Sequence, residues 1–188
     1  GLAIAQKNNG KGVSGIAPDC SFMPIQISGN QPGFSMTSVI DGILYAINNG
    51  ADVINLSIQQ MYPLEAQQIN QNDLDEILRN TNREDEYFWN EVFEMANNEN
   101  VTIVFAAGNT SVLVGLDAMK RDNSIITVSA LDKLNNKAEF TNYGEKSTVS
   151  APGVAIYSCR PGNRFVEMDG TSMSSPIVAG LIGLIKSV

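Results

Sequence analysis

The pattern of apolar and polar positions along the chain predicts short buried strands separated by amphipathic helices. Apolar runs predict strands at 21–27, 53–58, 101–105 and 124–130. Apolar residues at helical spacing predict one helix capped by Ser35 or Thr37 and another that begins near Glu86. Because a strand, a helix and a strand follow one another, we expect a βαβ unit and an α/β fold with a mostly parallel sheet.

The two ends of the chain have their own patterns. Residues 2–6 are helix-like, and 154–158 with 164–168 predict a β-hairpin across the turn at 160–163. From Gly170 onwards, a turn leads into an apolar stretch at helical spacing, which predicts a buried helix. Pro176 is expected near the first turn of that helix, where a missing N–H costs least.

A serine at the start of this last helix is the first candidate for chemistry. Ser172 would lie at the positive end of the helix dipole, among backbone N–H groups without intrahelical partners. This position suits a nucleophile whose developing oxyanion meets N–H donors. On this stretch alone, an ordinary Ser or Thr N-cap is the favoured interpretation.

Two other segments stand out. The segment 106–109 places the side-chain amide of Asn109 just beyond the carboxyl end of a predicted central strand, where ligands bind in open α/β sheets. From 59 to about 85 the chain is rich in Gln, Asn, Asp and Glu, with a short helix expected around 74–78. We expect this insertion to be a solvated surface excursion, with a substrate lid as the alternative.

Composition narrows the class of protein. The 188 residues, 43% of them hydrophobic and 17% charged, suit one globular domain. A net charge of −8 without a Lys/Arg cluster argues against a nucleic-acid partner, and no apolar run approaches the roughly 20 residues of a membrane span. Cys20 and Cys159 are either free thiols or one bridge. The chain has no histidine, so it cannot complete a mechanism that needs an imidazole base.

Four stretches together resemble the subtilisin-like serine proteases, the subtilases. They are 170–176, 106–109, 49–57 and 8–18. Their order and spacing agree with that family over nearly the whole chain, apart from the insertion after Gln59. The resemblance implies a three-layer α/β subtilisin-like fold with a mostly parallel central sheet. It further implies that residues 1–188 form a single partial catalytic domain whose N-terminal part is missing, with a polar insertion at 59–85.

By resemblance, the chain is part of a serine-type endopeptidase acting on a peptide or protein substrate. Ser172 is then the nucleophile, and the Asn109 amide with the Ser172 backbone N–H holds the oxyanion. Residues 57–59 would pair with the substrate backbone as an added strand, and residues 107 and 108 would line the pocket for the residue before the cleaved bond. The substrate-binding positions are thus Ser57, Ile58, Gln59, Ala107 and Gly108.

The sequence departs from the family in three respects. The catalytic Asp and His are absent, so we expect this chain alone to be a negligible protease and a missing N-terminal segment to carry both groups. Gln59 and Gln60 stand where the family usually has glycines, and Ile177 replaces a non-catalytic histidine. The alternative is a pseudoprotease that acts as a peptide-binding or scaffold module. A related family that uses Asp as its oxyanion residue is disfavoured by Asn109, and a nucleotide-binding domain by the lack of a Gly-rich phosphate loop.

Further expectations concern ligands and partners. No cofactor is predicted. The family often binds calcium partly through the loop matching 8–12, but this loop has no carboxylate, so calcium is left open and no ligand is assigned. Loss of upstream strands would leave a bare sheet edge, which predicts self-association. The resemblance implies a secreted or cell-envelope location.

Overall fold

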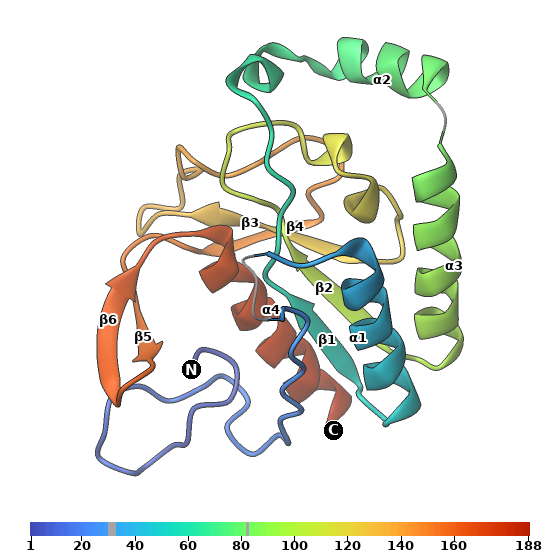
Figure 1. Cartoon of the computed structure of the whole chain (residues 1–188). Helices are drawn as coiled ribbons and strands as arrows, with labels where there is room; N and C mark the ends of the chain where they lie inside the picture. The colour runs from blue at the N-terminus through green and yellow to red at the C-terminus, as the bar shows by residue number, and fades with distance from the viewer. Residues whose placement is uncertain (30–32, 82) are drawn as a thin grey trace.

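The computed structural model describes residues 1–29, 33–81 and 83–188. They form three layers, with a parallel sheet in the middle and helices on either side (Figure 1). The sheet has the order β1-β2-β3-β4, and all neighbours pair in parallel. Its strands are β1 (Val53–Leu56), β2 (Thr102–Ala106), β3 (Ile126–Leu131) and β4 (Val149–Pro152). The predicted α/β class with a mostly parallel sheet is confirmed.

Helices cover both faces of the sheet. On one face lie α1 (Met36–Asn48) and α3 (Glu84–Asn98), and on the other lies α4 (Thr171–Lys186) (Figure 1). Because side chains alternate along a strand, Ile103 and Phe105 of β2 enter the core with α1 and α3, whereas Val104 packs on the α4 side. The helix α4 therefore packs in a small core of its own, on the face of the sheet opposite α1 and α3.

Local sequence explains where α1 begins. Of the two predicted caps, Ser35 is the one used: its hydroxyl accepts from the Ser38 N–H at 3.0 Å, and the Ser38 hydroxyl accepts from the Ser35 N–H at 3.0 Å. This reciprocal capping box satisfies two N–H groups of the helix start.

The predicted hairpin is also present. It consists of β5 (Ile156–Arg160) and β6 (Arg164–Met168), which pair antiparallel and deliver the chain to α4. Within the described parts of the chain, no helix is both long and apolar enough to cross a membrane.

Two predictions about the N-terminal region are wrong. Residues 2–6 form a turn rather than a helix, because the carbonyls of Leu2, Ala3 and Ala5 accept from the N–H groups of residues 15–17 instead of continuing a helix. Residues 21–27 are extended but form no strand. Their alternate apolar side chains pack on the core, and Ile25 and Ile27 lie against Gly42 of α1. A strand needs a hydrogen-bonded neighbour, and the sheet ends at β1.

A fourth parallel strand was missed. β4 is not among the strands that the apolar runs predict, yet it pairs with β3 in register from Val128–Val149 to Leu131–Pro152. Pro152 is tolerated because β4 is an edge strand that needs donors on one side only. The two-residue signal at Thr148 and Val149 was too short for strand periodicity.

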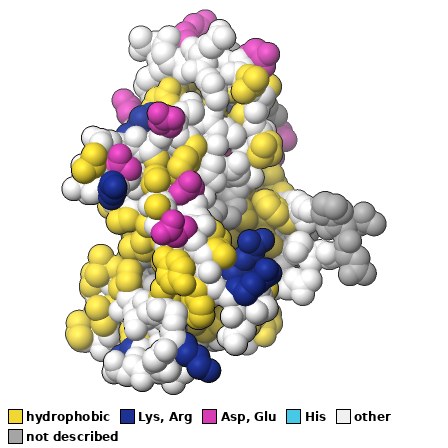
Figure 2. Space-filling model, turned by 90° about the vertical axis from the view of Figure 1, so that its left-hand side faces the viewer, with side chains coloured by type: hydrophobic (Ala, Val, Ile, Leu, Met, Phe, Trp, Pro, Cys, Tyr) yellow, Lys and Arg dark blue, Asp and Glu magenta, His cyan; other side chains and the backbone are white. Residues whose placement is uncertain are grey.

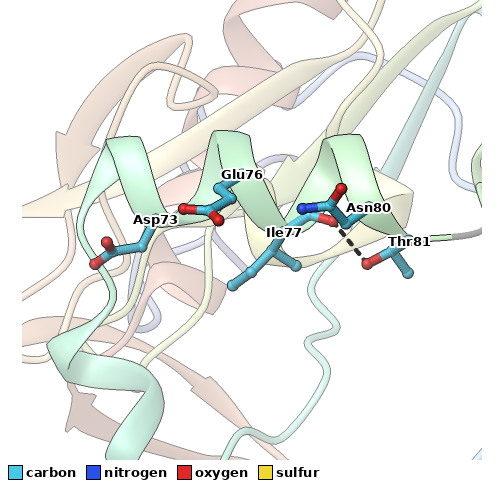
Figure 3. A pocket seen from close by; sticks show the side chains of 5 residues that line it. All are labelled: Asp73, Glu76, Ile77, Asn80 and Thr81. Carbon is cyan, nitrogen blue, oxygen red and sulfur yellow. Dashed lines mark hydrogen bonds between the residues drawn. The ribbon is translucent and has the colours of Figure 1, made fainter.

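The polar insertion is an ordered excursion above the sheet. It contains a 3₁₀ turn, η1 (Leu64–Gln68), and α2 (Gln71–Asn80), which covers the predicted short helix. Residue 82 of this insertion lies outside the described residues. Leu74 is only 2% exposed and packs against Gly115. A shallow hollow on α2 is lined by residues 73, 76, 77, 80 and 81, where the Thr81 hydroxyl donates to the Ile77 carbonyl at 2.7 Å (Figure 3). None of the predicted site residues lines it.

Candidate active site

Ser172 lies at the second residue of α4, as expected, but it does not cap the helix. The N-cap is Gly170, whose φ of 144° is a conformation that side chains rarely adopt, and it makes no side-chain cap bond. Among the described residues, the Ser172 hydroxyl makes no side-chain hydrogen bond, and the residue is half-buried. The N-cap interpretation is therefore wrong, and the nucleophile assignment stays a prediction that this position allows.

Asn109 is brought to the start of α4 by its own amide oxygen. Asn109 Oδ1 accepts from the Thr171 N–H at 2.8 Å and from the Thr171 hydroxyl at 2.9 Å, across 62 residues of sequence. Because the Thr171 N–H can only donate, the Asn109 side-chain atom that it contacts is the amide oxygen rather than the nitrogen. Nδ2 is left as the outward donor, beside Gly170. The geometry thus gathers an amide donor and a helix N-terminus next to Ser172.

Thr171 is a site residue that sequence analysis missed. Its side chain is fully buried; the hydroxyl donates to Asn109 Oδ1 and accepts from the Gly108 N–H at 3.1 Å. One hydroxyl therefore links the start of α4 to the end of β2. A threonine immediately before Ser172 was the available signal, but its partners are set only by the tertiary fold.

Asn142 organises the loop that follows β2. Its Nδ2 donates to the Ala107 carbonyl at 3.1 Å, and its Oδ1 accepts from the N–H groups of Thr110 and Val112 at 3.0 and 3.2 Å. A Cβ on Gly108 would lie 2.4 Å from Asn142 Nδ2, and the φ of Gly108 is 114°. Glycine is thus required at 108 by backbone conformation and by this close approach.

A buried ion pair supports the same loop from beneath. Lys120 Nζ lies 2.9 Å from Asp117 Oδ2 and donates to the Ala107 carbonyl at 3.3 Å, and both side chains are almost fully buried. Burial raises the pKa of the nearby Tyr62 hydroxyl, and the negative charge of Asp117 adds to that rise. Ala107 is therefore held by two donors, Lys120 and Asn142, and is itself buried.

The end of β1 is tied directly to α4. Ser57 Oγ lies 3.0 Å from Ser175 Oγ and donates to the Ser172 carbonyl at 3.4 Å. That carbonyl lacks its usual helical donor because Pro176, four residues on, has no N–H. Pro176 was expected near the first turn, but it lies in the second turn, and the freed carbonyl is met by Ser57.

The predicted substrate-binding residues divide into two groups. Ser57, Ile58 and Gln59 lie beyond the β1–β2 ladder, which ends where Leu56 pairs with Phe105. Ile58 packs partly on the core, whereas Gln59 Oε1 accepts from the Asn109 backbone N–H. Ala107 and Gly108 are buried on the opposite side of the same opening. The structure brings all five to the carboxyl ends of β1 and β2, and their roles stay predictions.

The site lacks metal ligands and a base. Across 1–29, 33–81 and 83–188, no group of three or more His, Cys, Asp or Glu side chains could hold a metal ion. Cys20 and Cys159 are free thiols. The chain has no histidine, and in the part of the chain that the structure describes no side chain that could act as a base is hydrogen-bonded to the Ser172 hydroxyl.

Comparisons with known proteins show which family of proteins the chain is similar to. The model of the subtilase family of peptidases matches residues 1–188. A thermostable alkaline protease from Halalkalibacterium halodurans is 33% identical over 98% of this chain and 45% of its own length. Thermitase from Thermoactinomyces vulgaris is 32% identical over all of this chain and 59% of its own length.

Solved structures show the same fold. A protease from Pseudoalteromonas arctica superposes with a TM-score of 0.74 at 24% identity, over all of this chain and 56% of that one. The prenylagaramide maturation protease PagA gives a TM-score of 0.70 at 24% identity, over 93% of this chain and 58% of that one. The chain thus spans about half the length of the proteins it matches.

Proposed function

Because this chain belongs to the subtilase family of serine proteases, we propose that it supplies the nucleophile-bearing part of a serine endopeptidase. One observation carries the proposal: the Thr171 N–H and hydroxyl fix Asn109 Oδ1 at the start of the helix that bears Ser172. An N-cap role for Ser172 does not require that arrangement. The substrate is a peptide or protein in extended form, laid along the end of β1.

In the proposed reaction, Ser172 Oγ attacks the carbonyl carbon of the scissile bond and gives up its proton to a base. The carbonyl oxygen becomes an oxyanion, which receives hydrogen bonds from Asn109 Nδ2 and the Ser172 backbone N–H. The oxyanion then re-forms the carbonyl as the bond to the leaving amine breaks, and that amine takes the proton from the base. The acyl group stays on Ser172 Oγ as an ester until water, giving its proton to the same base, hydrolyses it and regenerates the hydroxyl. Loss of the corresponding amide donor in subtilisin costs about 2.7–4 kcal/mol of transition-state stabilisation, so Asn109 is a major contributor here.

The base must come from outside this sequence, which contains no histidine. We assign it to a partner segment that carries an Asp and a His and completes the sheet beside β1. Loss of the serine or the histidine alone in subtilisin lowers kcat about 10⁶-fold, so this chain by itself is expected to be a negligible protease. None of these steps requires a resident metal.

Peptide hydrolysis tests the proposal. A fluorogenic peptide library is incubated with the chain of residues 1–188, with its native full-length protein, and with the Ser172→Ala form of each. We expect turnover only from the full-length protein, abolished by Ser172→Ala. Hydrolysis at an ordinary enzymatic rate by residues 1–188 alone would overturn the missing-base argument.

A second candidate function is a pseudoprotease that binds peptides without cleaving them. The absence of histidine and the Gln59 side chain in the cleft favour it, whereas Ser172 with an oriented Asn109 favours an enzyme. The native reading frame before residue 1 separates the two. An Asp after an apolar strand, followed by a His-containing motif, supports the enzyme, and a full-length protein that lacks both supports the binding module.

A further inference from the structure

An opening lies between the ends of β1 and β2. Beyond Phe105, β2 stays with β3: Ala106 pairs with Val128, and the Ala107 N–H donates to the Val128 carbonyl at 2.9 Å. Residues 57–59 follow β1 outside that ladder. Two segments that were paired in parallel therefore separate at their carboxyl ends, which is where open α/β sheets bind ligands.

The side chain of Gln59 bridges this opening. Its Oε1 accepts from the Asn109 backbone N–H and would lie 3.2 Å from a Cβ placed on Gly108. Its Nε2 donates to Met61 Sδ at 3.4 Å, so the amide is held at both ends, and the residue is half-buried. The Gln59 amide thus lies directly against Gly108, whose lack of a side chain leaves room for it.

The bridge lies directly beside the proposed chemistry. The residue whose N–H holds Gln59 is Asn109, and the side chain of Asn109 faces the start of α4 and Ser172. As predicted from the family resemblance, residues 107 and 108 line the pocket for the residue before the cleaved bond, so the side chain of that residue would lie next to Gly108 and the Gln59 amide. A large side chain there would meet the Gln59 amide and break its bond to Asn109.

We propose that Gln59 is a specificity-determining residue that closes this pocket, so that the site takes substrates with Gly or Ala before the scissile bond. The proposal rests on the proposed function, because it supposes that peptides bind with a carbonyl at Asn109. It requires a side chain long enough to cross the opening, which glutamine is and glycine is not. Removing the Gln59 side chain opens the pocket to large apolar residues.

Gln60 offers a matched control. It is the same residue type one position further on, it is exposed, and its Oε1 accepts from the Tyr62 hydroxyl at 3.3 Å. Gln60→Gly removes an equal side chain and adds equal backbone freedom without touching Asn109. An effect of Gln59→Gly that Gln60→Gly does not share therefore results from loss of the hydrogen bond between the Gln59 side chain and the Asn109 N–H.

Peptide binding gives the first test. Labelled tetra-alanine and Ala-Ala-Ala-Phe peptides, whose terminal carboxylate can occupy the oxyanion position, are titrated by fluorescence anisotropy into the chain and both variants. We expect the chain and Gln60→Gly to prefer the alanine peptide about ten-fold, and Gln59→Gly to lose or reverse that preference. An unchanged ratio in Gln59→Gly overturns the proposal, and so does failure of every variant to bind either peptide.

The Asn109 amide gives a second test that needs no substrate. In ¹⁵N NMR, Gln59→Gly should speed hydrogen exchange of that amide and shift its resonance, whereas Gln60→Gly should leave both unchanged. An unaffected Asn109 amide in Gln59→Gly refutes the bridge whatever the role of Ser172. If both tests support the bridge but the full-length protein shows no Ser172-dependent hydrolysis, only the proposed function fails.

Discussion

Lys120 is a charged side chain buried directly beneath the Ala107–Asn109 loop. It pairs with Asp117 and donates to Ala107, so it neutralises a buried carboxylate and holds the backbone of the pocket wall. Burying two charges costs several kcal/mol per ion, which the pair offsets only while both partners are present. The fold therefore tolerates this pair as a support for the site rather than as a source of net stability.

We expect Lys120→Met to lower the free energy of unfolding by about 3–5 kcal/mol, because Asp117 is left buried and unpaired. The double variant Lys120→Met/Asp117→Asn should recover most of that loss, since neither charge then remains. Urea unfolding followed by circular dichroism measures both. A loss below about 1 kcal/mol in the single variant would show that water reaches Asp117.

At the scale of elements, Glu86 joins α3 to the segment that follows η3 (Ala118–Lys120). It accepts from Nε of Arg83, the N-cap residue of the same helix, at 2.8 Å and from the Arg121 guanidinium at 3.2 Å. Arg121 in turn donates to the Gly115 and Leu116 carbonyls at 2.7 and 3.0 Å. The hydrogen bond from Arg83, with that from Arg121, holds the pKa of Glu86 below its ordinary value of 4.5 despite burial.

This shift predicts a pH dependence. Because the folded pKa of Glu86 is lowered, its contribution to stability is present above pH 4.5 and is lost as the pH falls through the folded pKa. Glu86→Gln should therefore lose stability less steeply than the wild type below pH 4.5. Glu91→Gln, an exposed change on the same helix, is the control. Equal acid slopes in all three proteins would contradict the assignment to Glu86.

The sequence predicted the elements that have strong periodicity of their own. α1, α3, α4, β1–β3 and the β5–β6 hairpin all appeared close to their expected positions. The failures share a cause: residues 2–6, 21–27 and β4 depend on which backbone partners the tertiary fold supplies. Likewise Ser172 and Asn109 were predicted as site residues from local patterns and the family resemblance, while Thr171 and Asn142 were not predicted, because their hydrogen bonds connect segments far apart in the sequence.

Two parts of the described molecule could contact a partner: the edge of the sheet at β1 and the exposed apolar side chains of α4. β1 is an edge strand of the described sheet, and its neighbourhood includes α4, where Leu181, Leu184 and Ile185 are 49%, 46% and 61% exposed. Hydrophobic side chains also gather on the face that Figure 2 shows. Edges with unpaired N–H and C=O groups are templates for added strands. The partner segment proposed to carry Asp and His would cover that edge.

Without such a segment, we expect self-association of the chain through β1. Sedimentation velocity should show larger species whose fraction rises with protein concentration, and Asn55→Lys in β1 should reduce that fraction by placing a charge on the edge. Leu134→Lys removes an apolar side chain that is 71% exposed but lies after β3, so it should have little effect. A strictly monomeric chain at all concentrations would contradict this expectation.

We infer that residues 1–188 hold a serine nucleophile and its oxyanion donors but no histidine base to activate it. A fluorophosphonate probe reports this directly, because it reacts covalently only with an activated serine. We expect the probe to label Ser172 in the native full-length protein, with labelling lost in Ser172→Ala, and to leave residues 1–188 unlabelled. Equal labelling of Ser172 in both proteins would contradict this inference.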